Sequence, residues 1–146
     1  APGMIELEMT ESALMNEPEK ARLVASSLVE AGFCLSIDDF GTGYSSLERL
    51  QSFPVFKLKI DMSFVRGMDT HAGNRAIVTA VIGMAKALKL ETVAEGVETA
   101  AQAALLTQLD CDEAQGYLYS KAIPAEALLR QWLHSRPVQP APPAGS

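Results

Sequence analysis

The sequence predicts an α/β fold built on a parallel sheet. Short apolar segments at residues 4–9, 33–37, 55–60, 92–94 and 112–118 have the length and composition of buried strands, and segments with helical spacing of apolar residues separate them. Strands that alternate with helices favour parallel pairing through crossover helices. Both an open doubly wound sheet and part of a (β/α)8 barrel fit this pattern. A complete barrel takes about 250 residues, and this chain has 146.

The first half of the chain predicts two helices between its strands. Asn16 is the expected N-cap of a helix that has Pro18 in its first turn and Gly32 at its C-cap. The strand at 33–37 ends at Asp38 and Asp39. A glycine-rich stretch follows, and residues 45–50 are expected to form a short helix.

The second half predicts three more helices and a tail. The helix at 74–88 has apolar residues on nearly every side, so we expect it to be well buried. Thr99 is the expected cap of a helix that reaches about residue 109, and Pro124 starts a last helix that ends near residue 133. Residues 135–146 are rich in proline, alanine and glycine, which predicts a flexible tail after a domain at 4–134.

Charge and composition exclude several classes of protein. A formal charge of −6 argues against binding a nucleic acid polymer or an anionic membrane surface. Cys34 and Cys111 lie far apart and have no metal-binding spacing, so we expect two reduced thiols. No segment approaches the roughly 20 apolar residues that span a bilayer. We expect a cytoplasmic location, with any membrane anchor of a parent protein outside this chain.

Polar residues stand at or near the carboxyl end of every predicted strand. In parallel α/β folds that end of the sheet is where ligands bind and reactions occur. Any single acidic residue there is commonly a helix cap or a solvated loop residue, but the same placement after five strands argues for a site. The candidates are Glu8, Glu11, Asp38, Asp39, Lys59, Glu95, Glu98 and Gln115.

The carboxylates in this set suit hard divalent cations. Several carboxylates in one place repel each other unless cations neutralise them, and oxygen ligands favour Mg²⁺ or Mn²⁺. Adjacent aspartates at a strand end are able to contact two ions about 4 Å apart, as in two-metal phosphodiester hydrolysis. Lys59 would then hold a water or a phosphate oxygen, and Glu95 would take a proton from the attacking water.

Five motifs in this order resemble the EAL domain family. The most specific is DDFGTGYSSL at residues 38–47; the others are EMTES at 8–12, LKID at 58–61, AEGVE at 94–98 and AQGY at 114–117. The resemblance covers residues 5–132. It implies a (β/α)8 barrel that hydrolyses cyclic di-GMP to the linear dinucleotide pGpG with Mg²⁺ or Mn²⁺.

The resemblance also implies a role for each candidate residue. Glu8, Asp38 and Asp39 correspond to metal ligands, Lys59 to the residue that orients the water, and Glu95 to the general base. Gln115 and Glu98 would support the site. Glu11 would brace the loop at 39–46, to which Gly41 and Gly43 give backbone freedom.

The family's Glu-Ala-Leu motif on an early strand and its metal-binding asparagine from a later strand are missing; the Glu-Ala-Leu letters at 126–128 fall in the last predicted helix and do not correspond to that strand. What is present corresponds to strands four to eight, so the expected fold is a partial barrel without its first three strands. We expect this chain to be an incomplete and inactive piece of a longer protein. Its open sheet edges would associate with another copy, as a homo-oligomer or by domain swapping, and its regulatory domains would lie outside this chain.

Two other functions fit parts of the pattern. A cyclic di-GMP receptor that does not cleave the nucleotide would share the fold, but such receptors usually lose ligands, and DDFGTGYSSL, Lys59 and Glu95 are intact here. A receiver-like signalling domain also has an acidic pair and a lysine. Its pair follows the first strand and its lysine the fifth, an order that this chain does not have.

Overall fold

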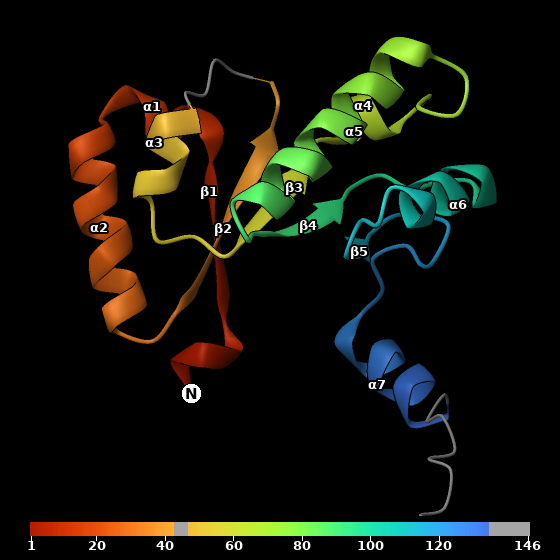
Figure 1. The fold of residues 1–146 in the computed structure, drawn as a ribbon. Helices are drawn as coiled ribbons and strands as arrows, with labels where there is room; N and C mark the ends of the chain where they lie inside the picture. The colour runs from red at the N-terminus through yellow and green to blue at the C-terminus, as the bar shows by residue number, and fades with distance from the viewer. Residues whose placement is uncertain (43–46, 135–146) are drawn as a thin grey trace, which may run out of the picture.

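A single parallel sheet organises the chain in the computed structural model, which describes residues 1–42 and 47–134. All neighbouring strands are parallel, and their order in the sheet is their order in the sequence (Figure 1). A doubly wound sheet reverses its strand order at a switch point, whereas a barrel adds each strand beside the last. The sequential order therefore selects the barrel type. The strands are β1 (Glu6–Thr10), β2 (Cys34–Phe40), β3 (Lys57–Ile60), β4 (Glu91–Ala94) and β5 (Glu113–Ala114).

All five predicted strands are present, but the last is much shorter than predicted. β5 has two residues instead of seven, and Gln115 follows the strand instead of lying within it. Gly116 explains the early end, because a Cβ on this residue would lie 2.2 Å from the carbonyl oxygen of Val97. The chain crosses the backbone of Val97 here, and the amide of Leu118 donates to that same oxygen at 3.0 Å.

Short helices directly after two strands were not predicted. The residue before each accepts a backbone hydrogen bond: Thr10 caps the first and Asp61 the second. Asn16 is the last residue of the first of these helices, so the predicted N-cap role is wrong; Glu17 holds that position. The helices are η1 (Pro2–Met4), α1 (Glu11–Asn16), α2 (Pro18–Glu30), α3 (Leu47–Ser52), α4 (Met62–Val65), α5 (Ala72–Ala87), α6 (Ala100–Gln108) and α7 (Ala125–His134).

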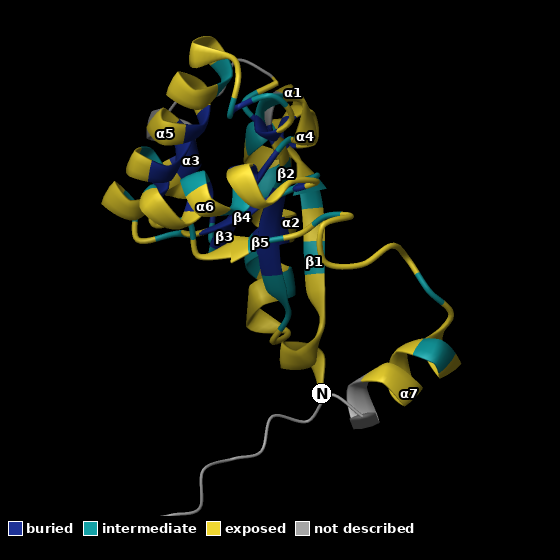
Figure 2. Cartoon of the chain, turned by 90° about the vertical axis from the view of Figure 1, so that its right-hand side faces the viewer, coloured by how far each residue is buried: buried dark blue, intermediate teal, exposed yellow. Residues whose placement is uncertain are grey.

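Thr99 caps α6 as predicted, through a reciprocal pair of hydrogen bonds with Gln102. The expectation that the long helix is well buried is wrong. Only one side of α5 packs against the core, through Val78, Val81, Ile82 and Ala85. The sheet covers that one side, and the remainder of the helix faces solvent (Figure 2).

Alternation along the central strands separates a core face from an inner face. Leu35 and Ile37 on β2, with Leu58 and Ile60 on β3, are at most 1 % exposed and belong to the hydrophobic core. The residues between them point to the opposite face of the sheet, which we call the inner face. Lys57 and Lys59 are the β3 residues on this face.

The last helix lies apart from the sheet in both views (Figures 1 and 2). Leu128 and Leu129 of α7 are 55 % and 58 % exposed. No helix in the described part of the chain is long and apolar enough to cross a membrane. The predicted tail at 135–146 and the predicted loop residue Gly43 lie outside the described residues.

Candidate active site

The ammonium group of Lys59 is the centre of the polar residues at the carboxyl end of the sheet. The side chain is only 8 % exposed, and its Nζ contacts carboxylates from three other parts of the sheet. Burial alone lowers the pKa of a lysine, but hydrogen bonds to these carboxylates outweigh it and raise the pKa of Lys59. The contacts are Glu8 Oε1 at 2.6 Å, Asp38 Oδ1 at 3.1 Å and Glu95 Oε1 at 2.8 Å.

Asp38 and Asp39 both contribute to the site although they are neighbours on one strand. Successive strand residues normally point to opposite faces of a sheet. Here the pairing of β2 with β3 shifts register between Ile37 and Phe40, and Asp39 adopts a left-handed backbone with φ of 54°. This irregularity redirects the second aspartate, so that both carboxylates reach the carboxyl end.

The carboxyl group of Asp39 is in an acidic environment. Burial, followed by the charges of Asp38 and Asp61, raises its pKa above the ordinary value, and the charge of Lys59 opposes the shift. Burial also acts on Asp61, but hydrogen bonds from Ser63 outweigh it and hold the pKa of Asp61 below its ordinary value. Asp39 therefore lies where a nearby positive charge would stabilise its ionised form.

Three of these carboxyl groups are close enough to share a metal ion. Oxygen atoms of Asp38, Asp39 and Glu95 all lie within 4.8 Å of one another. An all-carboxylate donor set matches the preference of Mg²⁺ and Mn²⁺ for oxygen ligands. Glu8, the other predicted ligand, lies next to this group through its contact with Lys59. The residues present therefore fit a divalent metal ion.

Glu11 connects the first strand–helix junction to the backbone that follows β2. Its side chain is buried, and Oε2 accepts a hydrogen bond from the amide of Gly41 at 2.9 Å. Gly41 has φ of 100°, a conformation that favours glycine, and a Cβ there would lie 3.0 Å from the ring of Phe64. The loop after Asp39 is thus held at its start by a buried carboxylate.

A hollow of about 500 Å³, open to solvent, lies beside the carboxylate group and includes Glu95, Gln115 and Glu98 in its lining. Glu98 is not among the grouped carboxylates. Its Oε1 instead accepts two hydrogen bonds from Arg66, from Nε at 3.1 Å and from Nη2 at 2.7 Å. The sequence analysis did not include Arg66 in the site, because nothing in its local pattern marks a partner 32 residues away.

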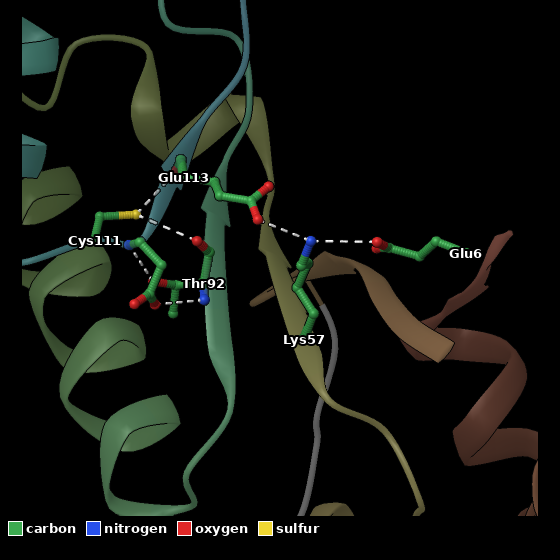
Figure 3. A network of polar contacts seen from close by, with 6 residues as sticks. Glu6, Lys57, Thr92, Cys111 and Glu113 are labelled. Atoms are coloured by element: carbon green, nitrogen blue, oxygen red, sulfur yellow. Dashed lines mark hydrogen bonds and ion pairs between the residues drawn. The ribbon is translucent and has the colours of Figure 1, made fainter. Parts of the chain in front are cut away.

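A second lysine-centred group on the inner face was also missed. Lys57 is 7 % exposed, and its Nζ lies 3.2 Å from Glu6 Oε2 and 3.1 Å from Glu113 Oε1 (Figure 3). Burial opposes its charge, but hydrogen bonds to Glu113 and Glu6 outweigh this and raise the pKa of Lys57. The spacing of two between Lys57 and Lys59 was a usable signal, because it places both side chains on one face of a strand.

Comparisons with known proteins agree with this geometry. A model of the EAL domain family matches residues 1–122. The cyclic di-GMP phosphodiesterase NbdA of Pseudomonas aeruginosa is 44 % identical over 146 residues, which are 100 % of this chain and 18 % of NbdA. The chain spans less than a quarter of the length of such curated relatives.

Solved structures with the same fold hold the nucleotide. A phosphodiesterase complex of MucR with c-di-GMP has a TM-score of 0.85 and 42 % identity, covering 87 % of this chain and 51 % of that one. A manganese and c-di-GMP complex of BlrP1 from Klebsiella pneumoniae has a TM-score of 0.76 and 36 % identity, covering 82 % and 31 %. The five-stranded sheet thus corresponds to part of these larger domains, and the chain belongs to the EAL domain family.

Proposed function

We propose that this chain supplies the catalytic carboxylates and the lysine of a metal-dependent phosphodiesterase domain that hydrolyses cyclic di-GMP to pGpG. The observation that carries the proposal is the contact of Lys59 with carboxylates from β1, β2 and the end of β4. The relatives and solved structures that are named phosphodiesterases support the reaction, and the nucleotide complexes support the substrate.

Asp38, Asp39 and Glu8 would hold Mg²⁺ or Mn²⁺ in this reaction. The bound cations would lower the pKa of a water and stabilise charge on the phosphoryl oxygens. The carboxylates of the chain bring the donors, since oxygen atoms of Asp38, Asp39 and Glu95 lie within 4.8 Å of one another and oxygen ligands suit Mg²⁺ and Mn²⁺. The manganese complex of BlrP1 supports this choice of metal.

Two residues of the chain would act on the attacking water. Glu95 carries its carboxylate within the metal-binding group, and its side chain is 19 % exposed, so it is placed to accept a proton from a water held there. Lys59 already donates toward Glu95 at 2.8 Å. Its ammonium would keep the base oriented and would hold the water or a phosphate oxygen opposite it.

Gln115 and Glu98 line the hollow beside Glu95, where part of the nucleotide would lie. The remaining metal ligands and substrate contacts would come from outside this chain, which spans about half of the MucR structure. We therefore expect little turnover by the chain alone. Its edge strands β1 and β5 each pair on one side only within the described residues, so association with a further copy or segment would complete the sheet.

The test is hydrolysis of cyclic di-GMP with Mn²⁺, followed as pGpG by chromatography, in this chain and in a protein that carries the whole domain. Glu95→Gln keeps the size of the base and removes its proton-accepting oxygen, so we expect it to lower the turnover of the whole domain by at least about 100-fold. Lys86→Met, which removes a cation from an exposed ion pair, is the control. Binding of the nucleotide without cleavage by the whole domain would instead assign a receptor.

A further inference from the structure

The inner face of the sheet carries two tiers of charged residues. We call Glu8, Asp38, Lys59 and Glu95 the upper tier, and Glu6, Lys57 and Glu113 the lower tier. Each tier has one buried ammonium group and carboxylates from other strands. The upper tier belongs to the proposed active site, whereas the lower tier has no part in the proposed chemistry.

Each member of the lower tier stands two residues before a site residue on the same stretch of chain. A spacing of two keeps side chains on one face and separates them by about 7 Å along a strand. The lower tier therefore repeats the arrangement of strands used by the site, one layer below it. The pairs are Glu6 with Glu8, Lys57 with Lys59 and Glu113 with Gln115.

Lys57 connects the middle of the sheet to both of its edges. It is the first residue of β3, whereas its partners are the first residues of β1 and β5, which are the outermost strands. Figure 3 shows the ammonium between the two carboxylates. No other described ion pair joins the two edge strands through one side chain.

β5 depends on such side-chain contacts because its ladder is minimal. Only Glu113 and Ala114 pair with β4. Directly before the strand, Asp112 Oδ2 accepts hydrogen bonds from the amide and the hydroxyl of Thr92, each at 2.8 Å. On the inner face of the sheet, the ammonium group of Lys57 contacts Glu113, the first residue of β5. Directly after the strand, the amide of Gln115 donates to Ala94 at 2.8 Å and its carbonyl accepts from Val97 at 3.0 Å, so the two side-chain contacts flank a short stretch of backbone pairing.

We propose that Lys57 is a positioning residue, which holds the two edge strands at the spacing that the site above it requires. The cation attracts one carboxylate from each edge, and this draws the ends of the sheet toward β3. Displacement of reacting groups by about 1 Å can cost a factor of 100 in rate. We call the contacts of Lys57 with Glu6 and Glu113 the lysine tie. The proposal rests on the proposed function for its effect on turnover, whereas the lysine tie is testable without that function.

The first measurement is amide hydrogen exchange in this chain. The amide of Gln115 donates to Ala94 at 2.8 Å, and the amide of Ala21, in the first turn of α2 and away from the lysine tie, donates to Glu17 at 2.9 Å. We expect Lys57→Met to speed exchange at Gln115 at least tenfold more than at Ala21. Lys57→Arg, which keeps the cation, should preserve most of the protection. Equal acceleration at both amides would show a general loss of stability and would overturn the proposal.

The second measurement separates positioning from charge balance. The variant Glu6→Gln, Lys57→Met, Glu113→Gln removes all charges of the lower tier, so it avoids unpaired carboxylates and should recover most of the stability lost in Lys57→Met. We expect its Gln115 amide to stay fast-exchanging. Recovery of protection together with stability would mean that Lys57 only balances charge, and the proposal would be wrong.

The third measurement is turnover in a protein that carries the whole domain. Lys57→Met and the triple variant should lower kcat for cyclic di-GMP by about 10- to 100-fold, with KM within about twofold, because Lys57 does not line the hollow beside Glu95. An unchanged kcat in a stable triple variant would refute the positioning role. If the unaltered domain has no turnover, the proposed function fails, and hydrogen exchange alone decides the tie.

Discussion

Replacing Lys59 by methionine removes the one cation that the carboxylates of the upper tier share. Methionine keeps the apolar stem and leaves the carboxylates of Glu8, Asp38 and Glu95 without their partner. Breaking a buried ion pair costs about 3–5 kcal/mol. The side chains of these three residues are 48 %, 23 % and 19 % exposed, so water recovers part of the loss. We therefore expect the lower end, about 3 kcal/mol.

The assay is circular dichroism in buffer that contains EDTA. Denaturant unfolding gives the free energy of unfolding, and thermal unfolding gives Tm. For a chain of this length a loss of about 3 kcal/mol corresponds to a fall in Tm of about 6–12 °C. Lys86→Met is the matched control, because its ion pair with Asp110 is exposed, at 39 % and 87 % for the two side chains. Exposed pairs contribute less than about 1 kcal/mol, so the control should unfold near the parent chain.

The pH dependence gives the result that would refute this reasoning. Contacts with carboxylates raise the pKa of Lys59 in the folded chain, so its contribution is fully present below the unfolded pKa of about 10.4 and is lost as pH rises through the folded pKa. The difference between the parent chain and Lys59→Met should be constant from pH 7 to 9 and should shrink above pH 10.4. A difference below about 1 kcal/mol, or one that grows at alkaline pH, would contradict the account.

Three further predictions concern single positions. Gly116→Ala would bring a Cβ within 2.2 Å of the backbone of Val97, so we expect the free energy of unfolding to fall by about 3 kcal/mol or more. The control is Gly83→Ala on an open helix surface, which should raise stability by up to about 1 kcal/mol. Ser36 is completely buried, and its Oγ has no hydrogen-bond partner among the described residues. Ser36→Ala should therefore leave the free energy of unfolding unchanged or raise it by about 1 kcal/mol. A loss of stability would instead indicate a hydrogen bond between Oγ and an internal water. Folding lowers the pKa of Asp61, so the ionised side chain stabilises the folded chain above about pH 3.9, and this contribution disappears as pH falls below that value. Asp61→Asn should lower the free energy of unfolding by about 1 kcal/mol at pH 6 and leave it unchanged at pH 2. Equal losses at both pH values would show that the charge of Asp61 does not contribute to capping α4.

The number of strands and the polar residues at their ends were readable from local patterns, whereas these patterns fitted both an open doubly wound sheet and a partial barrel. Apolar segments of three to seven residues, separated by segments with helical spacing, predicted the right number of strands. Polar residues at their ends placed Asp38, Lys59 and Glu95 together, because parallel strands end on one side of a sheet. The Thr99 cap was readable because it depends on a local contact: its partner Gln102 is three residues away.

Features that depend on distant contacts were not readable. Alternation along a strand predicts opposite faces for adjacent residues, and only the shifted register and left-handed Asp39 bring the two aspartates to one site. The partners of Lys57 lie 51 and 56 residues away. The end of β5 is imposed by the backbone of Val97, which the composition of residues 112–118 does not reveal.

The sequential strand order has a consequence for how the molecule forms. Each strand pairs with the strand that was synthesised just before it, so no strand has to wait for a distant segment before its ladder closes. The connection between successive strands contains one or two helices at each step, and because the entropic cost of loop closure grows only slowly with length, that cost stays nearly constant along the chain. Pulse labelling of nascent chains would then show protection advancing from β1 to β5, with the lysine tie to the last strand closing at the end.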